Sequence, residues 1–181
     1  SPGSTLKPYV YGMALDDGLI HSHSLMVDAP QSFGGYRPTN FNAAFSGPVA
    51  AETALQRSLN VPAVDLLDRV GPARFAARLD HAGIGLRFPR GAKPNLTLIL
   101  GGTGARLEDL VGAHAALSRG GIAGRVRYTP DDPEIERRLM SPGAAWIVHG
   151  ILAANPRPGE RLETFDTGRR SRLAWKTGTS Y

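Results

Sequence analysis

The sequence has no cysteine and few aromatic residues, and lysine is scarce among its basic residues. Without cysteine there are no disulfides and no thiolate metal sites, which is compatible with either the cytosol or the periplasm. No apolar run approaches the ~18 residues that a membrane span needs. The net charge is +5, but the arginines are scattered and aromatic residues make up 7%, so a solvated basic face is favoured over a nucleic-acid surface. The 181 residues, 41% of them hydrophobic, predict one folded domain.

The scarcity of lysine makes its positions informative. The chain has three lysines, Lys7, Lys93 and Lys176, and two of them lie in short polar motifs. In Ser4-Thr5-Leu6-Lys7 a hydroxyl and an amine stand three residues apart at the head of a predicted helix, on one face. A neutral lysine can take the proton of a nearby serine, whereas arginine keeps its charge in proteins. The motif therefore makes Ser4 a candidate nucleophile and Lys7 its candidate base.

Two further motifs complete a set. Ser58-Leu59-Asn60 falls in a predicted turn between two helices, and Lys176-Thr177-Gly178-Thr179 follows a predicted strand. The three motifs, in this order, resemble S-x-x-K, S-D-N and K-T-G, the pattern of class A β-lactamases and penicillin-binding proteins. Taken alone, Asn60 has a simpler interpretation as the cap of the following helix.

Periodicity and breakers predict mostly helices. We expect helices at residues 4–15, 49–57, 62–70, 72–82, 107–119 and 141–155, and strands at 122–128 and 172–177. Residues 95–100 are predicted to be extended, and residues 16–48 form a long irregular stretch. His21-x-His23 lacks a third ligand, so no metal site is predicted. The glycine-rich loop at 101–104 is not followed by G-K-[ST], which disfavours phosphate binding.

Longer stretches around the motifs resemble the transpeptidase domain of penicillin-binding proteins, in particular the bifunctional class A members of the 1C type. The similarity covers residues 1–8 around the serine, 36–41 (Y-R-P-T-N-F), 47–63 through the second motif, 107–121, and 175–181 (W-K-T-G-T-S-Y). It extends over essentially the full length.

The resemblance implies an α+β fold, in which a five-stranded antiparallel sheet is covered by helices. Residues 1–181 would then be one penicillin-binding transpeptidase domain truncated at both ends, since the chain begins three residues before the serine. We expect a helical lobe plus a truncated antiparallel sheet, with Lys176 to Thr179 on the strand that borders the cleft.

The resemblance also implies roles for the catalytic residues. Ser4 would attack the carbonyl carbon of the substrate, and Lys7 would be the base that takes its proton. Ser58 would relay a proton between Lys7 and Lys176. Asn60 would hold Lys7 together with an amide of the substrate.

Substrate binding is assigned in the same way to the third motif. Lys176 with the hydroxyls of Thr177 and Thr179 would attract a substrate carboxylate, and Gly178 would allow the substrate backbone to approach closely. The oxyanion would lie between the backbone N–H groups of Ser4 and Thr179. No cofactor and no metal is implied.

The implied activity is that of a peptidoglycan D,D-transpeptidase. Its partners would be peptidoglycan stem peptides and β-lactam antibiotics, not nucleic acid. It would act on the extracytoplasmic face of the membrane, which it would reach only through an N-terminal part of its parent protein. A β-lactamase is disfavoured because no E-x-x-L-N follows the second motif. A D,D-carboxypeptidase and a non-catalytic β-lactam-binding sensor or scaffold remain alternatives.

Overall fold

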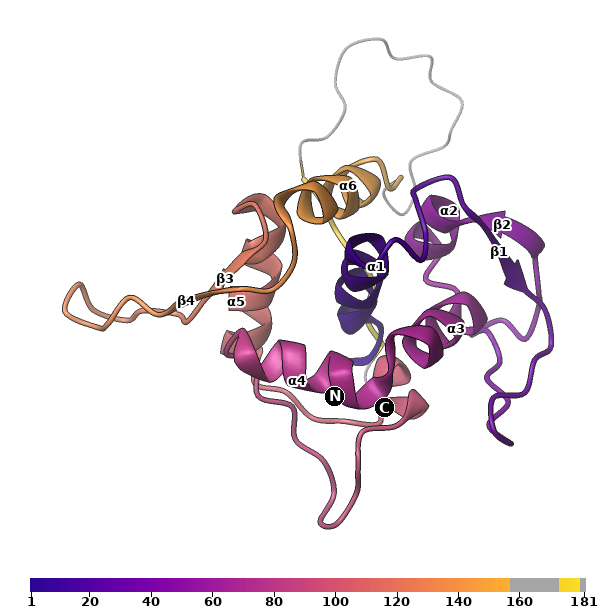
Figure 1. Cartoon of the computed structure of the whole chain (residues 1–181), viewed down its shortest axis with the longest axis horizontal. Coiled ribbons are helices and arrows are strands. Elements are labelled where there is room, and N and C mark those ends of the chain that lie inside the picture. The colour runs from indigo at the N-terminus through magenta and orange to yellow at the C-terminus, as the bar shows by residue number, and fades with distance from the viewer. Residues whose placement is uncertain (157–172, 180–181) are drawn as a thin grey trace, which may run out of the picture.

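The structure is a computed structural model that describes residues 1–156 and 173–179. Figure 1 shows α1 near the middle of the molecule, with α3, α5 and α6 around it. The elements in chain order are η1 (Gly3–Leu6), α1 (Lys7–Asp16), β1 (Leu25–Asp28), β2 (Gly47–Ala50), α2 (Ala51–Gln56), α3 (Asn60–Val70), α4 (Pro72–His81), η2 (Leu96–Leu100), α5 (Leu107–Ser118), β3 (Ile122–Gly124), β4 (Glu136–Arg138) and α6 (Pro142–Ala153).

The central helix α1 is enclosed by its neighbours, and its residues from Lys7 to Ala14 are all buried. The predicted helix at 4–15 is confirmed with one correction, because its first turn is the 3₁₀-helix η1. Proline has no N–H, so Pro8 cannot donate to the Ser4 carbonyl as an α-helix would require. The Lys7 N–H donates to that carbonyl instead, which closes a 3₁₀ turn. Ser4 therefore lies in η1 and Lys7 begins α1.

The helices predicted at 72–82, 107–119 and 141–155 are confirmed as α4, α5 and α6, with each end within two residues of the prediction. The Ser141 hydroxyl caps α6 by accepting a hydrogen bond from the Ala144 N–H at 3.1 Å. The predicted strand at 122–128 is shorter, because β3 covers Ile122–Gly124 alone.

Two predictions about extended chain were wrong. The supposedly irregular stretch contains β1, which pairs antiparallel with β2, so Pro48 lies in a strand and does not open a helix. Strand β2 occupies the first residues of the helix predicted at 49–57, and α2 begins at Ala51. Residues 96–100 form the 3₁₀-helix η2 and are not extended, since the Asn95 side chain caps them by accepting from the Thr97 N–H at 3.0 Å.

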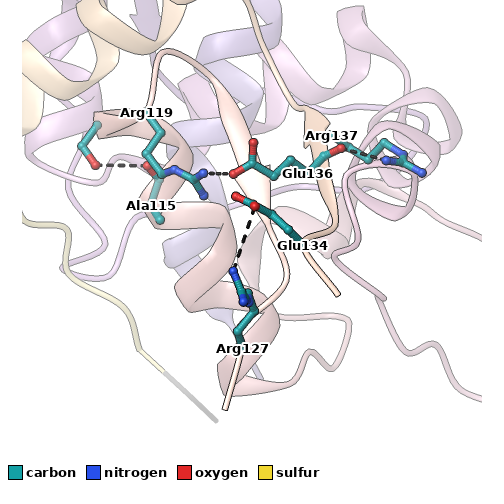
Figure 2. Close-up of polar contacts among 7 residues, drawn as sticks. Ala115, Arg119, Arg127, Glu134, Glu136 and Arg137 are labelled. Carbon is teal, nitrogen blue, oxygen red and sulfur yellow. Dashed lines mark hydrogen bonds and ion pairs between the residues drawn. The ribbon is translucent and has the colours of Figure 1, made fainter. Parts of the chain in front are cut away.

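The hairpin of β3 and β4 projects from the body (Figure 1). Figure 2 shows its polar contacts: Arg119 of the helix end binds Glu136 of β4, and Arg127 lies 4.0 Å from Glu134. These pairs join α5 to the hairpin and one side of the loop to the other.

The α+β class is confirmed, with helices and two two-stranded antiparallel sheets in the described ranges. The strand predicted at 172–177 is not formed within residues 173–179, and Arg172 lies outside the described residues. An extended chain becomes a strand by pairing, and here the Trp175 N–H bonds to the Leu152 carbonyl of α6 at 3.4 Å. No described helix is both long and apolar enough to span a membrane.

Candidate active site

A cavity of about 410 Å³ brings together residues of all three motifs. Its lining comes from η1, the loop before β2, the turn between α2 and α3, the end of η2 and the C-terminal segment: Ser4, Phe41, Arg57, Ser58, Asn60, Leu100, Thr177 and Thr179. Residues more than 170 positions apart in the sequence thus face one hollow. A second hollow of about 500 Å³ near the β3–β4 hairpin contains none of the predicted site residues.

Ser4 lies on the cavity wall and is partly buried. In a 3₁₀-helix the side chains at positions i and i+3 eclipse each other, so this first turn stacks Lys7 on the same side as Ser4. Within the described residues the Ser4 hydroxyl makes no hydrogen bond. Ser4 therefore remains a candidate nucleophile on the cavity wall.

Lys7 is completely buried, with 0% of its surface exposed. Its Nζ donates to the Ser58 carbonyl and to Asn60 Oδ1, each at 2.7 Å, and lies 3.4 Å from Ser58 Oγ. A neutral amine has two N–H groups and one lone pair. The two short hydrogen bonds use both N–H groups of a neutral amine, which leaves its lone pair for the longer contact with Ser58 Oγ or for an incoming proton.

The pKa of Lys7 is lowered from 10.5 to about 6, first by burial and then by the positive charge of Lys176. Burial disfavours the ammonium because it loses its hydration, and a nearby like charge adds repulsion. Lys7 forms no ion pair among the described residues. At pH 7 a lysine with this pKa is neutral in about nine molecules of ten, whereas a free lysine is neutral in about four of ten thousand.

Ser58 ends α2 in a Schellman motif: the Ser58 N–H bonds to the Leu55 carbonyl at 3.1 Å and the Leu59 N–H to the Ala54 carbonyl at 3.0 Å. This position needs a left-handed backbone and is usually glycine. Ser58 adopts it with a φ of 57°, which is strained for a residue with a Cβ. The strained turn directs the Ser58 carbonyl to one lysine and its hydroxyl to the other.

Asn60 is the first residue of α3. The alternative that it caps this helix is wrong, because the N-cap position is Leu59 and no side chain caps α3. Instead, Asn60 Oδ1 accepts from Lys7, and its Nδ2 donates to the Thr39 carbonyl at 2.7 Å.

Lys176 completes the hydrogen-bonded row. Its Nζ donates to Ser58 Oγ at 2.7 Å, and also to the carbonyl and hydroxyl of Thr177 at 2.9 and 3.2 Å. Burial lowers the pKa of Lys176 to about 8. Ser58 Oγ thus lies between two amines, of which Lys176 holds its proton more tightly than Lys7.

The C-terminal segment, drawn as the yellow trace in Figure 1, lies close to the first residues of the chain at two glycines. A Cβ on Gly3, whose φ is +51°, would lie 2.2 Å from the Thr179 carbonyl oxygen. A Cβ on Gly178 would lie 2.5 Å from Thr5 Cγ2. Gly178 does not line the cavity, so in this structure its missing side chain makes room for η1.

Sequence reasoning assigned no role to three lining residues, Phe41, Arg57 and Leu100. Phe41 was visible in the Y-R-P-T-N-F stretch, and Arg57 directly precedes the second motif. Phe41 is 85% exposed, which is unusual for an aromatic side chain and marks the cavity rim. The sequence around Leu100 did not indicate a site residue, because Leu100 lines the cavity only as a result of the position of η2 in the folded chain.

The two other sequence candidates lie elsewhere. His23 Nδ1 is 3.6 Å from Glu52, and the residues described include no cluster of three or more His, Cys, Asp or Glu side chains that could hold a metal. In the glycine-rich loop Gly101 lies against Ser1 and Gly3, and Gly102 lies against Thr97. The loop therefore packs against the N-terminal residues and against η2.

Comparison with known proteins identifies the family of this chain. The family model described as the penicillin-binding protein transpeptidase domain matches residues 1–181. The chain belongs to the penicillin-binding protein transpeptidase family. It is 56% identical to penicillin-binding protein 1C of Escherichia coli (strain K12), covering 100% of this chain and 23% of the relative. It is 34% identical to penicillin-binding protein 1F of Bacillus subtilis (strain 168), covering 99% of this chain and 26% of the relative.

The family assignment and the resemblance to the 1C type are thereby confirmed. The chain spans about a quarter of the length of these curated relatives. Solved structures agree on the fold: the PonA1 protein from Mycobacterium tuberculosis in complex with penicillin V (TM-score 0.68, 23% identity, 84% of this chain and 46% of that one) and a peptidoglycan glycosyltransferase from Burkholderia ambifaria (TM-score 0.71, 20% identity, 84% of this chain and 54% of that one). The predicted fold family is confirmed.

Proposed function

We propose that this chain catalyses D,D-transpeptidation of peptidoglycan through an ester on Ser4. The observation that carries the proposal is the completely buried Lys7 one turn after Ser4, with its Nζ held by the Ser58 carbonyl and Asn60 Oδ1 and its pKa lowered by burial to about 6. Substrates would be stem peptides that end in D-alanyl-D-alanine, and β-lactams would acylate the same serine.

In the first half-reaction Ser4 Oγ attacks the carbonyl carbon of the penultimate D-alanine, and its proton passes to the Lys7 lone pair. The resulting oxyanion is held by the backbone N–H groups of Ser4 and Thr179. A donor of this kind typically contributes 10²–10³ in rate. The row Lys7, Ser58, Lys176 then delivers a proton to the departing nitrogen, so that the C–N bond breaks and D-alanine leaves.

In the second half-reaction an amine of a neighbouring strand attacks the Ser4 ester. The amine loses its proton to the same row of groups, the C–O bond breaks and Ser4 regains its hydroxyl. In the earlier acylation step, Lys176 and the hydroxyls of Thr177 and Thr179 attract the terminal carboxylate of the donor strand. Water in place of the amine would give the carboxypeptidase reaction.

We place this activity on the extracytoplasmic side of the membrane, where peptidoglycan is assembled. A membrane anchor would belong to an N-terminal part of the parent protein. The proposal needs no metal and no cofactor, because Lys7 supplies the base and backbone N–H groups the electrophilic assistance.

Mass spectrometry after exposure to penicillin tests the proposal. We expect one adduct on the peptide that contains Ser4, and no adduct in Ser4→Ala. An adduct on another serine would overturn the assignment. A D-alanyl-D-alanine donor offered with and without an acceptor amine then distinguishes the activities: transfer to the amine supports transpeptidation, release to water a carboxypeptidase, and no turnover a sensor.

A further inference from the structure

A wholly buried carboxylate lies behind the second motif, outside the cavity lining. Asp28, at the end of β1, has 0% exposure. Its two oxygens accept from Asn40 Nδ2 at 2.8 and 3.0 Å and from the Ser46 N–H at 2.8 Å. It forms no ion pair with the described part of the chain. A carboxylate buried in this way is costly unless its hydrogen bonds are in place.

The partner of this carboxylate, Asn40, is 5% exposed and has every polar atom of its side chain engaged. Its Nδ2 donates to Asp28 and to the Ala44 carbonyl at 2.9 Å, and its Oδ1 accepts from the backbone N–H of Asn60 at 2.8 Å. Each neighbour of Nδ2 is an acceptor, and the neighbour of Oδ1 is a donor. The orientation of the Asn40 amide is therefore fixed by its surroundings.

Thr39, the residue before Asn40, also binds the Asn60 side chain. The Thr39 carbonyl accepts from Asn60 Nδ2 at 2.7 Å, while Asn60 Oδ1 accepts from Lys7 at 2.7 Å. A flip of the Asn60 amide would turn Nδ2 toward the Lys7 N–H groups, donor against donor. Thr39 and Asn40 thus hold Asn60 at both its side chain and its backbone.

We propose that Asn40, anchored on Asp28, is a positioning residue for acyl transfer: it fixes Asn60 and, through Asn60 Oδ1, the amine of Lys7. The inference rests on the proposed function, since it assumes that Lys7 serves Ser4. Asn40 does not line the cavity, so it acts through Asn60. The hydrogen-bonded row runs from Asp28 through Asn40 and Asn60 to Lys7. A catalytic group misplaced by about 1 Å can lose ~10²-fold in rate, which sets the expected effect.

The test is the second-order acylation rate with a fluorescent penicillin, measured on the native protein at 25 °C. Asn40→Asp removes both donors of the amide and sets two carboxylates side by side, which repel each other. We expect acylation to slow by about 10²-fold. The matched control is Asn42→Asp, the same change two residues away. Asn42 is exposed, and its Oδ1, which accepts from the Ala44 N–H at 3.2 Å, survives the substitution, so its rate should stay unchanged.

Two more variants separate positioning from loss of folding. The exchange Asp28→Asn with Asn40→Asp restores a donor facing an acceptor and keeps the acceptor for the Asn60 N–H. It should recover about tenfold or more of the lost rate. Asn40→Ser keeps a hydroxyl for Asp28 but is too short to reach Asn60 as well. It should slow acylation by about tenfold while the variant stays folded at the assay temperature, although its melting temperature falls because the Ala44 carbonyl and the Asn60 N–H lose their partner.

The outcomes are decisive. Wild-type rates in Asn40→Asp or in a folded Asn40→Ser, or an exchange variant no faster than Asn40→Asp alone, would overturn the inference. Failure of the proposed function looks different, because the wild type itself would then carry no adduct on Ser4.

Discussion

In the proposed mechanism, the rate of acylation varies with pH because two amines, those of Lys7 and Lys176, lie on either side of Ser58 Oγ. For this mechanism Lys7 must be neutral to take the Ser4 proton, and Lys176 must be charged to attract a carboxylate. With pKa values of about 6 and about 8, both conditions hold together between these two pH values. We expect a bell-shaped profile of the second-order acylation rate, with limbs near pH 6 and pH 8. Because the charge of Lys176 lowers the pKa of Lys7, the two apparent pKa values of the profile describe the pair of lysines together.

The size of each limb follows from the proton count. One pH unit below about 6, the neutral fraction of Lys7 is about one tenth, so the rate should fall about tenfold per unit. A lysine with its ordinary pKa would place this limb near pH 10, roughly four units higher. The difference between the two positions is far larger than the scatter of a kinetic measurement.

Exchanging one amine at a time assigns the limbs. Lys176→Arg keeps the charge but does not titrate, so the upper limb should vanish while the lower limb stays near pH 6. Lys176→Gln removes the repulsion on Lys7, which should move the lower limb to higher pH. Lys7→Arg keeps its proton and should abolish acylation at every pH tested.

The assay is stopped-flow acylation by a fluorescent penicillin from pH 4.5 to 9.5, with unfolding monitored at each pH. A lower limb that ignores Lys176→Gln would refute the electrostatic coupling of the two lysines. An active Lys7→Arg variant would refute the role of Lys7 as base.

Two further predictions follow from buried groups at the site. The pKa of Lys7 is lower in the folded chain than in the unfolded one, so between pH 6 and 10.5 the unfolded chain binds more protons and stability rises with pH. Denaturant unfolding should show a free energy of unfolding that rises by about 1.4 kcal/mol more per pH unit in the wild type than in Lys7→Met over pH 7–9, and equal slopes would contradict the buried neutral amine. Gly3→Ala should displace the Thr179 carbonyl and slow acylation by about 10²-fold, whereas Gly18→Ala, which has a similar φ of +67° and nothing within 4 Å of its Cβ, should acylate normally; equal rates would show that Thr179 needs no fixed place.

The three motifs were readable from the sequence because they depend on residue type and order. The helices α4, α5 and α6 were readable because proline, glycine and apolar periodicity act locally. Segments whose shape depends on partners far along the chain were not. Strand β1 exists because β2 pairs with it across an intervening loop, and residues 173–179 lack such a partner among the described residues.

The sequence by itself determined the family, the α+β class and the identity of the candidate nucleophile and base. Tertiary structure decided the environment that would make them reactive. Burial of Lys7 and the approach of Lys176 from the far end of the chain lower the pKa of Lys7, and no local pattern reports desolvation or a distance between residues 169 positions apart. The buried row from Asp28 to Asn60 likewise needs three separate segments to meet, because each hydrogen bond joins groups that are neighbours in space alone.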